Sequence, residues 1–356
     1  MRDCPLTRTP TVATVAAYDK KDKARKTGEV WMTFFSQGSR SAGFLFAGML
    51  ATLAPAAAQD LSSKPIRMIV GLAAGGGTDI SARLVAQKMT ESLKTTVFVE
   101  NKPGGNFVIA GKELQSAAPD GHTLYFISSS SLIAQALHPD HPIDLLKFAA
   151  VSEAATGPLI LVVRNNLGVK SLGELLDMAR KNPGKLKFGT GGGTASSLYL
   201  ATELFKSTTG VNITIVPYKG SAPALNDLLG GHIDAMFDAM PMMVPQAKEG
   251  KVTAVGVTGA KRAQALPNVA AIQESGLKYE ITGWYGVLAP QGTPPAVVQK
   301  LRDEVNKAVT QKDVVEKLAA QGMEPRGTQP GDFAKYMQAE LAAYRKIVKD
   351  ANIKPQ

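Results

Sequence analysis

The stretch that decides the fold runs from Ile66 to Met89 and reads IRMIVGLAAGGGTDISARLVAQKM. It opens with a strand-like apolar run, Ile66–Val70, and continues to three consecutive glycines, Gly75–Gly77. After the glycines, apolar residues recur at intervals of three and four, which is typical of one face of a helix. These residues are Ala82, Val85, Ala86, Met89 and Leu93. The order strand, glycine turn, helix predicts an α/β unit.

The glycine turn occurs twice in the chain. GGGTDIS begins at Gly75, and GGGTASS begins at Gly191, 116 residues later. The second copy also follows a predicted strand, Leu186–Phe188. It also precedes an apolar helical face, formed by Leu198, Ala201, Leu204 and Phe205. The repeat therefore predicts that the chain builds the same strand–turn–helix device twice.

Strand and helix patterns alternate through most of the remaining chain. Further β-rich runs predict strands at Thr96–Val99, Thr123–Ile127, Leu159–Val163, Asn212–Val216, Ile233–Phe237 and Val252–Val257. Ser171 and Glu174 have capping-box spacing, which predicts the start of a helix. After Pro290 the pattern is helical, with apolar stripes at Val297, Val298, Leu301, Val305 and Val309 and at Phe333, Met337, Leu341, Tyr344 and Val348. We expect parallel α/β sheets followed by a helical C-terminal region.

The first 58 residues do not resemble the rest of the chain. Arg40 precedes a short apolar stretch that ends in Ala56-Ala57-Ala58, a pattern typical of a secretory signal peptide over residues 32–58 with cleavage after Ala58. The alternative is a membrane anchor, but the apolar run is too short to span the roughly 30 Å of hydrocarbon. Residues 1–31 would then be an upstream extension.

Charge and cysteine content describe an exported soluble protein. The chain carries 40 Lys+Arg and 30 Asp+Glu, and residues 59–356 alone have a formal charge of +6. No dense basic cluster with interleaved aromatic residues occurs, so nucleic-acid binding is disfavoured. The single cysteine, Cys4, precedes the predicted cleavage site, so the mature chain has no thiol nucleophile and no disulfide. We expect a soluble periplasmic monomer.

The glycine turns predict an anion site. A helix N-terminus presents unpaired N–H groups and about +0.5 of partial charge, and glycines let a ligand approach those donors. The hydroxyls of Thr78, Thr194 and Ser196 could donate to the ligand or cap the helices, whereas ionised Asp79 can only accept N–H groups. Neither turn has a P-loop or G-x-G-x-x-G pattern, so we expect a carboxylate rather than a nucleotide. Plain turn glycines are the alternative.

Candidate catalytic and metal-binding residues are few. His138 and His141 lie in H-P-D-H-P, where the prolines predict a loop, and no further ligand supports a metal. We expect His122 and His232 at the surface. The run Ser128–Ser131 follows a predicted strand and either supplies hydroxyls to the cleft or is a plain polar loop. A serine hydrolase would need a base that the sequence does not offer.

Several ordered motifs together give a family resemblance. They are KPIRMIVGLAAGGGTDISAR, VENKPGG, AAPDGHTL, GKLKFGTGGGT, VPYKGSAPALNDLLGGHIDAMFD, GWYGVLAPQGTP and LAAQGMEP. Over about residues 64–354 the chain resembles the Bug family, the extracytoplasmic solute-binding receptors of tripartite tricarboxylate transporters. The resemblance implies a type II periplasmic-binding-protein fold with two α/β lobes around a cleft. It implies chain crossings near Leu159–Arg164 and Thr282–Gly286, with residues 59–160 and 284–356 in lobe 1 and 161–283 in lobe 2.

The resemblance also implies a set of ligand-binding residues. They are Ala74, Gly75, Gly76, Thr78, Asp79, Ser128, Ser129, Ser130, Gly191, Gly193, Thr194, Ser196, Tyr218, Lys219, Gly220, Ala222 and Asp238. Three of them have plainer alternatives, because Lys219 could be a solvated turn lysine, Tyr218 a packing residue and Asp238 a helix cap. Trp284 would line the hinge or the cleft, although aromatic residues are more often core.

Two departures from the family's pattern concern the ligand. Gly71 stands where the family usually has proline or a larger residue, and Pro103–Phe107 replaces its P-G-A-G-G segment. The sequence therefore predicts a periplasmic receptor for a small organic carboxylate, without cofactor or metal, that serves a membrane transporter or a signalling partner. The alternatives are an exported serine hydrolase, acting through the run Ser128–Ser131, and a structural or adhesive module.

Overall fold

The structure is a computed structural model that describes residues 61–62 and 64–353, so the predicted signal peptide and upstream extension lie outside the described residues. The strands are β1 (Ile66–Val70), β2 (Val97–Asn101), β3 (Thr123–Ser128), β4 (Ala149–Arg164), β5 (Lys187–Gly191), β6 (Thr214–Tyr218), β7 (Ala235–Ala239), β8 (Val252–Val257), β9 (Thr282–Ala289) and β10 (Glu324–Pro325). The helices are α1 (Gly77–Leu93), α2 (Val108–Gln115), α3 (Ser129–Leu137), α4 (Leu172–Lys181), α5 (Ser197–Thr209), α6 (Ser221–Leu229), α7 (Met240–Lys248), α8 (Pro295–Thr310), α9 (Lys312–Ala320) and α10 (Pro330–Asp350).

Two sets of parallel strands form the framework. In the first set, which we call lobe 1, the order is β2-β1-β3, and β9 runs antiparallel beside β3. In the second, lobe 2, the order is β6-β5-β7, and β4 runs antiparallel beside β7. Each set therefore places the strand before its glycine turn, β1 or β5, in the centre. The strand–turn–helix device occurs twice, as the repeated glycine turn predicts.

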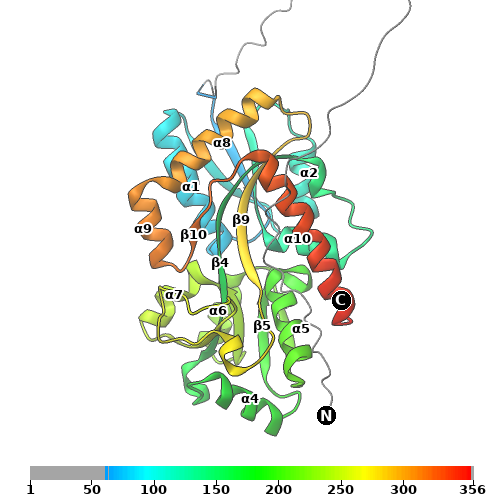
Figure 1. Ribbon diagram of the computed structural model, residues 1–356, viewed down its shortest axis with the longest axis vertical. Coiled ribbons are helices and arrows are strands. Elements are labelled where there is room, and N and C mark those ends of the chain that lie inside the picture. Colours follow the sequence, from blue (N-terminus) through cyan, green and yellow to red (C-terminus); the bar gives the residue numbers. More distant parts are fainter. Residues whose placement is uncertain (1–60, 63, 354–356) are drawn as a thin grey trace, which may run out of the picture. The chain divides into compact units, whose positions relative to one another are not determined.

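The long strands β4 and β9 connect the two lobes, and Figure 1 shows them side by side between the two sets of helices. Residues 149–158 of β4 pair with β9, whereas residues 159–164 pair with β7 and β8. Where the chain crosses between the lobes, Gly157 faces Gly283 in the β4–β9 pair.

The predicted strand Leu159–Val163 is thus only the second part of β4. The first part, AAVSEAATGP, is rich in alanine and glycine and poor in β-branched residues, so its sequence gives little strand signal. Its central place in the sheet, between β9 and β10, makes it a strand nonetheless.

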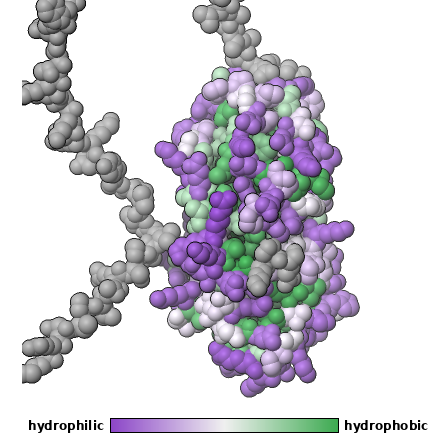
Figure 2. Space-filling view, turned by 90° about the vertical axis from the view of Figure 1, so that its right-hand side faces the viewer, coloured by the Kyte–Doolittle hydropathy of each residue, from purple (hydrophilic) through white to green (hydrophobic). Residues whose placement is uncertain are grey.

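The apolar core lies on both sides of the sheet. Alternating residues of β4 belong to opposite apolar clusters: Leu159 and Leu161 face one cluster, and Ile160 and Val162 face the other. The C-terminal stripes are helices as predicted, since Val297, Leu301, Phe333, Met337 and other members are buried in α8 and α10. On the face in Figure 2, hydrophilic residues cover most of the outline and apolar residues are gathered between them.

Some local expectations need correction. Trp284 does not line the cavity described below; it is buried against α10, where its indole N–H lies 3.2 Å from the Glu340 carboxylate. His122 is buried at 7% exposure rather than at the surface, whereas His232 is exposed as expected. The Ser171 hydroxyl accepts the Glu174 N–H, but the Glu174 carboxylate accepts from Lys170 N–H, so the capping box is only half formed.

His138 and His141 lie at and beyond the end of α3 outside any helix or strand, as the flanking prolines predict. Among residues 61–62 and 64–353, no group of three or more His, Cys, Asp or Glu side chains is arranged to hold a metal ion. In the same part of the chain, none of the helices combines the length and the apolar character that a membrane crossing requires.

Candidate functional site

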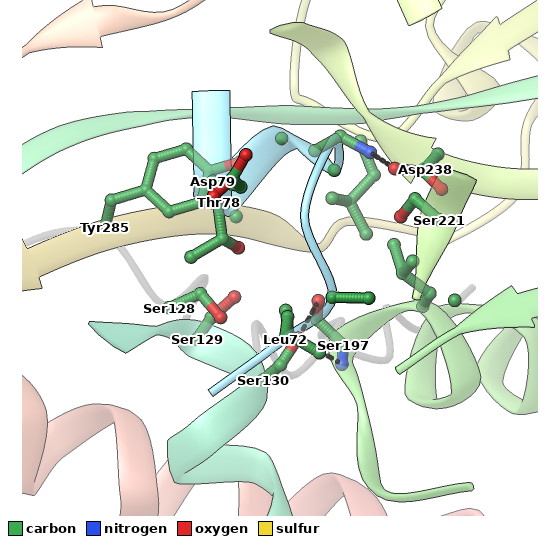
Figure 3. A pocket seen from close by; sticks show the side chains of 18 residues that line it. Leu72, Thr78, Asp79, Ser128, Ser129, Ser130, Ser197, Ser221, Asp238 and Tyr285 are labelled. Atoms are coloured by element: carbon green, nitrogen blue, oxygen red, sulfur yellow. Dashed lines mark hydrogen bonds between the residues drawn. The ribbon is translucent and has the colours of Figure 1, made fainter. Parts of the chain in front are cut away.

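The carboxyl ends of the parallel strands meet at one place. The strand order reverses beside β1 and beside β5, because the chain passes from each of them to the neighbour on one side and returns later on the other side. Such a reversal opens a crevice beyond the carboxyl ends of the strands. The segments after β1, β3, β5 and β7 all reach this crevice and enclose an inner cavity (Figure 3). Its volume is about 30 Å³, which leaves room for only a few water molecules at most.

Asp79 holds the first glycine turn in shape. Its carboxylate accepts a hydrogen bond from the Gly75 N–H at 3.0 Å and one from the Asn101 amide at 2.9 Å, and it pairs with Arg83 at 2.9 Å. Burial raises the pKa of this carboxyl, but the bonds from Arg83, Gly75 and Asn101 outweigh it and hold the pKa below its usual value. Asp79 thus accepts one backbone N–H, that of Gly75 in the turn, but it does not cap the N-terminus of α1, which has no side-chain cap.

The glycines allow close approach between the lobes. A Cβ atom on Gly77 would lie 2.6 Å from the Ala239 Cβ of the other lobe, and one on Gly220 would lie 2.8 Å from the Ala73 Cβ. Within lobe 2, a Cβ on Gly191 would lie 2.6 Å from the Ser221 backbone nitrogen. No real side chain fits at such distances. Because glycine has no side chain, the opposing loops can come into close contact at these positions.

The serine run begins a helix and lines the cavity, so it is not a plain polar loop. Ser128 is the N-cap residue of α3. The Ser130 hydroxyl lies 2.9 Å from the Ser197 hydroxyl and accepts the Ser197 N–H at 3.1 Å, which links the N-termini of α3 and α5 across the two lobes. The Ser131 hydroxyl pairs with Tyr125. Among the described residues, none of the hydrogen-bond partners named here for Ser130 and Ser131 is a histidine or lysine base, so the arrangement gives no support to a serine hydrolase.

Asp238 is the penultimate residue of β7 and lines the cavity from lobe 2. Its side chain has no exposure; Oδ1 accepts the Ala239 N–H at 2.7 Å, while Oδ2 has no hydrogen-bond partner. Burial raises the pKa of Asp238 to about 7, against the opposing effect of Ser221 and the Ala239 N–H. The N-cap residue of α7 is Ala239, so Asp238 is not the helix cap that its position allowed.

A second, outer pocket of about 440 Å³ adjoins the inner cavity. Leu72 lines both, and a Cβ atom on Gly192 would lie 3.2 Å from the Leu72 side chain, so this contact separates the two spaces. Lys219 is exposed at the outer pocket. Tyr218 also lines it, but its hydroxyl donates to Asp227 at 2.6 Å, and burial followed by this Asp227 contact raises its pKa to about 12.

The outer pocket contains both departures from the family's pattern. A Cβ on Gly71 would lie 2.9 Å from the Phe107 ring and 2.7 Å from the Tyr125 hydroxyl. Phe107 therefore fills the space that a larger residue at position 71 would need. Asn106 and Phe107 both have positive φ, at 49° and 72°, a conformation that is costly for residues with side chains.

The two spaces together contain many, but not all, of the sequence-predicted site residues. The inner cavity is lined by Gly76, Thr78, Asp79, Ser128, Ser129, Ser130, Gly191 and Asp238. The outer pocket is lined by Gly193, Tyr218 and Lys219. Neither is lined by Ala74, Gly75, Thr194, Ser196, Gly220 or Ala222. Ser196 instead caps α5, because its hydroxyl accepts the Tyr199 N–H at 3.2 Å.

The sequence reasoning missed several lining residues. They include Leu159, Ser197, Leu198, Ser221, Ala239, Gly283 and Tyr285. Ser197 and Ser221 directly follow predicted site residues, so their hydroxyls could have been considered. Gly283 and Tyr285 reach the cavity only through the pairing of β9 with β4, which no local pattern signals.

Comparison with known proteins identifies the family. The sequence profile described as "Tripartite tricarboxylate transporter family receptor" matches residues 81–353. The chain belongs to this family. It is 33% identical to BugT of Bordetella pertussis over 314 residues, which cover 87% of this chain and 96% of that protein.

Solved structures agree with this membership. The structure described as "R. palustris Rpa4515 with adipate" has a TM-score of 0.79 at 33% identity, with 83% of this chain and 100% of that chain covered. MatC from Rhodopseudomonas palustris with bound malate has a TM-score of 0.76 at 31% identity, with 80% and 99% covered. The fold is that of the periplasmic binding proteins, and the tripartite tricarboxylate transporter receptor family is one of solute-binding receptors rather than enzymes.

Proposed function

We propose that this receptor captures a small organic carboxylate between its lobes. The observation that carries the proposal is the Ser130–Ser197 contact, which brings the N-termini of α3 and α5 together at the inner cavity. Gly77 at the start of α1 and Ser221 at the start of α6 line the same cavity. Helix N-termini and hydroxyls are the donors that suit a carboxylate.

Capture requires the lobes to open and close. The inner cavity holds about 30 Å³, so anything larger than water can enter only if the lobes move apart and the Ser130–Ser197 contact breaks. The adipate and malate in the two related structures support a carboxylic acid as the guest. The proposal includes the positions of the two lobe boundaries, which we place directly after residue 160 and directly after residue 283.

The biological setting is also a proposal. Export through a signal peptide cleaved after Ala58 would deliver a monomer to the periplasm. The family supports delivery of the ligand to membrane transporter subunits. A signalling partner is the alternative.

The experiment is a thermal-shift screen of the chain beginning at Gln59 against small acids and their matched amides. A ligand at about 100 times its Kd adds about 2.7 kcal/mol, a clearly measurable shift. We expect an acid to shift the midpoint and its amide to leave it unchanged. The Ser130→Ala variant should lose much of the shift, whereas Ser116→Ala, an exposed serine outside both pockets, should keep it.

The result that contradicts the proposal is the absence of any shift after the protein has been unfolded, dialysed and refolded to remove copurified ligand. Turnover of activated esters that is lost in Ser→Ala variants of Ser128–Ser131 would instead favour the hydrolase.

A further inference from the structure

The loop that precedes α2 has a conformation that residues with side chains rarely adopt. Its residues Gly104, Gly105, Asn106 and Phe107 have φ values of 118°, 56°, 49° and 72°. Glycine adopts positive φ at no steric cost, and the last two positions of the family's P-G-A-G-G segment are glycines, but here they are Asn106 and Phe107. Such a conformation persists only where the surrounding structure holds it.

Two histidines contact Asn106, one at its main chain and one at its side chain. Nε2 of His141 lies 2.9 Å from the Asn106 carbonyl oxygen, and Nε2 of His138 lies 3.2 Å from the Asn106 side-chain amide nitrogen. Ile143 fixes the other side of the His141 ring, because its carbonyl oxygen lies 2.9 Å and its backbone nitrogen 3.3 Å from Nδ1. The H-P-D-H-P motif therefore contacts the strained loop through both of its histidines.

The two rings have opposite roles in these contacts. A carbonyl oxygen only accepts, so Nε2 of His141 donates its proton to Asn106. An amide NH₂ group only donates, so Nε2 of His138 must be the bare nitrogen of a neutral ring. Burial, followed by the charge of His141, lowers the pKa of His138 and so favours that neutral form.

The strained loop places Phe107 at the outer pocket. The side chain is buried, with 4% exposure, and a Cβ atom on Gly71 would lie 2.9 Å from its ring. Both residues line the outer pocket of about 440 Å³, which Pro217 and Tyr218 of lobe 2 also line. Because this pocket adjoins the inner cavity, a ligand with its carboxylate in the cavity would extend its other end toward the Phe107 ring.

Helix α3 joins the two ends of this site. Ser129 at its start lines the inner cavity, and His138 is its C-cap residue. The 9 residues of α3 are all buried, so the core fixes the helix in place. A packed helix therefore connects the carboxylate end of the site with the histidines that contact the loop.

We propose that His138 and His141 are positioning residues that keep Phe107 at the outer pocket and so set the length of the acid that the receptor selects. The inference rests on the proposed capture of a carboxylate and concerns the far end of that ligand. Neither histidine lines the inner cavity or the outer pocket, so both act through Asn106. Without these two contacts, the loop relaxes toward negative φ and the Phe107 ring leaves the space beside Gly71.

The test measures the length preference by calorimetry on the chain beginning at Gln59. The probes are the straight dicarboxylic acids from succinate to suberate, in which each member has one methylene more than the last. We expect the wild-type chain to prefer one length, and His141→Ala to reduce the ratio of affinities between that member and its neighbours about five- to tenfold. His232→Ala is the matched control, because His232 is exposed and lines neither pocket. An unchanged ratio in His141→Ala, or a wild-type chain without a length preference, overturns the inference.

A double-mutant cycle tests His138 without a bound ligand. Amide hydrogen exchange of residues 102–111 reports how firmly the loop is held. We expect His138→Ala to speed this exchange about five- to tenfold in the wild-type background. The same change should have little effect once Asn106→Gly has removed both the amide partner and the strain. Equal effects in the two backgrounds would mean that His138 supports the fold in general, which contradicts the inference.

Nitrogen-15 spectra of the imidazole rings need no variant and give a readout that a merely structural role would not change. At about pH 8, above the lowered pKa of His138, its ring should be neutral with a bare Nε2 and the proton on Nδ1. A proton on Nε2 of His138 at this pH overturns the role given to this residue.

This inference and the proposed function can fail separately. If no acid in the series or in the thermal-shift screen binds the refolded wild-type chain, the proposed capture of a carboxylate fails, and the selection by length fails with it. If acids bind but both histidine variants keep the wild-type length preference, only the positioning role of His138 and His141 is overturned.

Discussion

The two GGGT turns have the same four letters but begin their helices at different places. In lobe 1, α1 begins at Gly77, the third glycine of the motif. In lobe 2, a short 3₁₀ turn over Gly193–Ala195 follows, and α5 begins only at Ser197. As a result Thr78 lies in a helix and lines the inner cavity, whereas its counterpart Thr194 does not line it.

The residue after the threonine also differs between the two turns. In lobe 1 it is Asp79, whose carboxylate accepts the Gly75 N–H and so satisfies the turn from inside the helix. In lobe 2 it is Ala195, which has no acceptor, so the cap comes from the next residue, Ser196. The same glycine motif is thus followed by a helix in both lobes, but only α5 has a side-chain cap on its first N–H groups, whereas Asp79 accepts the Gly75 N–H that precedes α1.

The largest effect is expected for Asp79→Ala. The variant removes the bonds to Gly75, Arg83 and Asn101, so we expect a loss of about 2–3 kcal/mol in the free energy of unfolding. Because the folded-state pKa of Asp79 is lowered, its contribution to stability is present above its unfolded value of 3.8 and is lost as the pH falls below it. Urea denaturation at several pH values measures both. If the variant leaves the free energy of unfolding unchanged, Asp79 does not stabilise the turn that precedes α1.

A smaller effect, mainly on binding, is expected for Gly77→Ala. Its Cβ would lie 2.6 Å from the Ala239 Cβ of the other lobe, which can move away when the lobes open, and 2.9 Å from the Tyr285 hydroxyl of β9, which belongs to the same lobe. The part of an overpacking cost of about 1–3 kcal/mol that comes from Ala239 would fall on the closed state alone and weaken the binding of an acid from the screen by up to about 150-fold. Gly76→Ala is the matched control, because its Cβ would meet Ser221 at an ordinary 3.6 Å. Similar affinities for both variants would contradict the role given to Gly77.

The smallest effect is expected for Ser196→Ala. The lost cap should lower the free energy of unfolding by about 1 kcal/mol and leave ligand affinity nearly unchanged, since Ser196 lines neither pocket. Thermal unfolding with and without ligand separates the two quantities. A large loss of affinity would mean that Ser196 touches the ligand, and the two turns would then be more alike than their helix starts suggest.

The sequence predicted the local part of the structure well. The strand–turn–helix units, the serine run at the cavity and the C-terminal stripes depend on periodicity and glycine chemistry that a short window contains. It did not predict the first part of β4 as a strand or the cavity positions of Gly283 and Tyr285. These depend on which strands pair across more than a hundred residues, which local pattern does not encode.

The Gly157–Gly283 pair has a mechanical consequence. It lies where β4 and β9 cross between the lobes, and Gly283 and Leu159 also line the inner cavity. Under the proposed closure, the axis of rotation therefore passes directly beneath the ligand. The lever arm at the ligand is short and the lever arm at the far ends of the lobes is long. A small adjustment around the guest becomes a large displacement at the outer helices, which is where a partner could read whether the receptor is loaded.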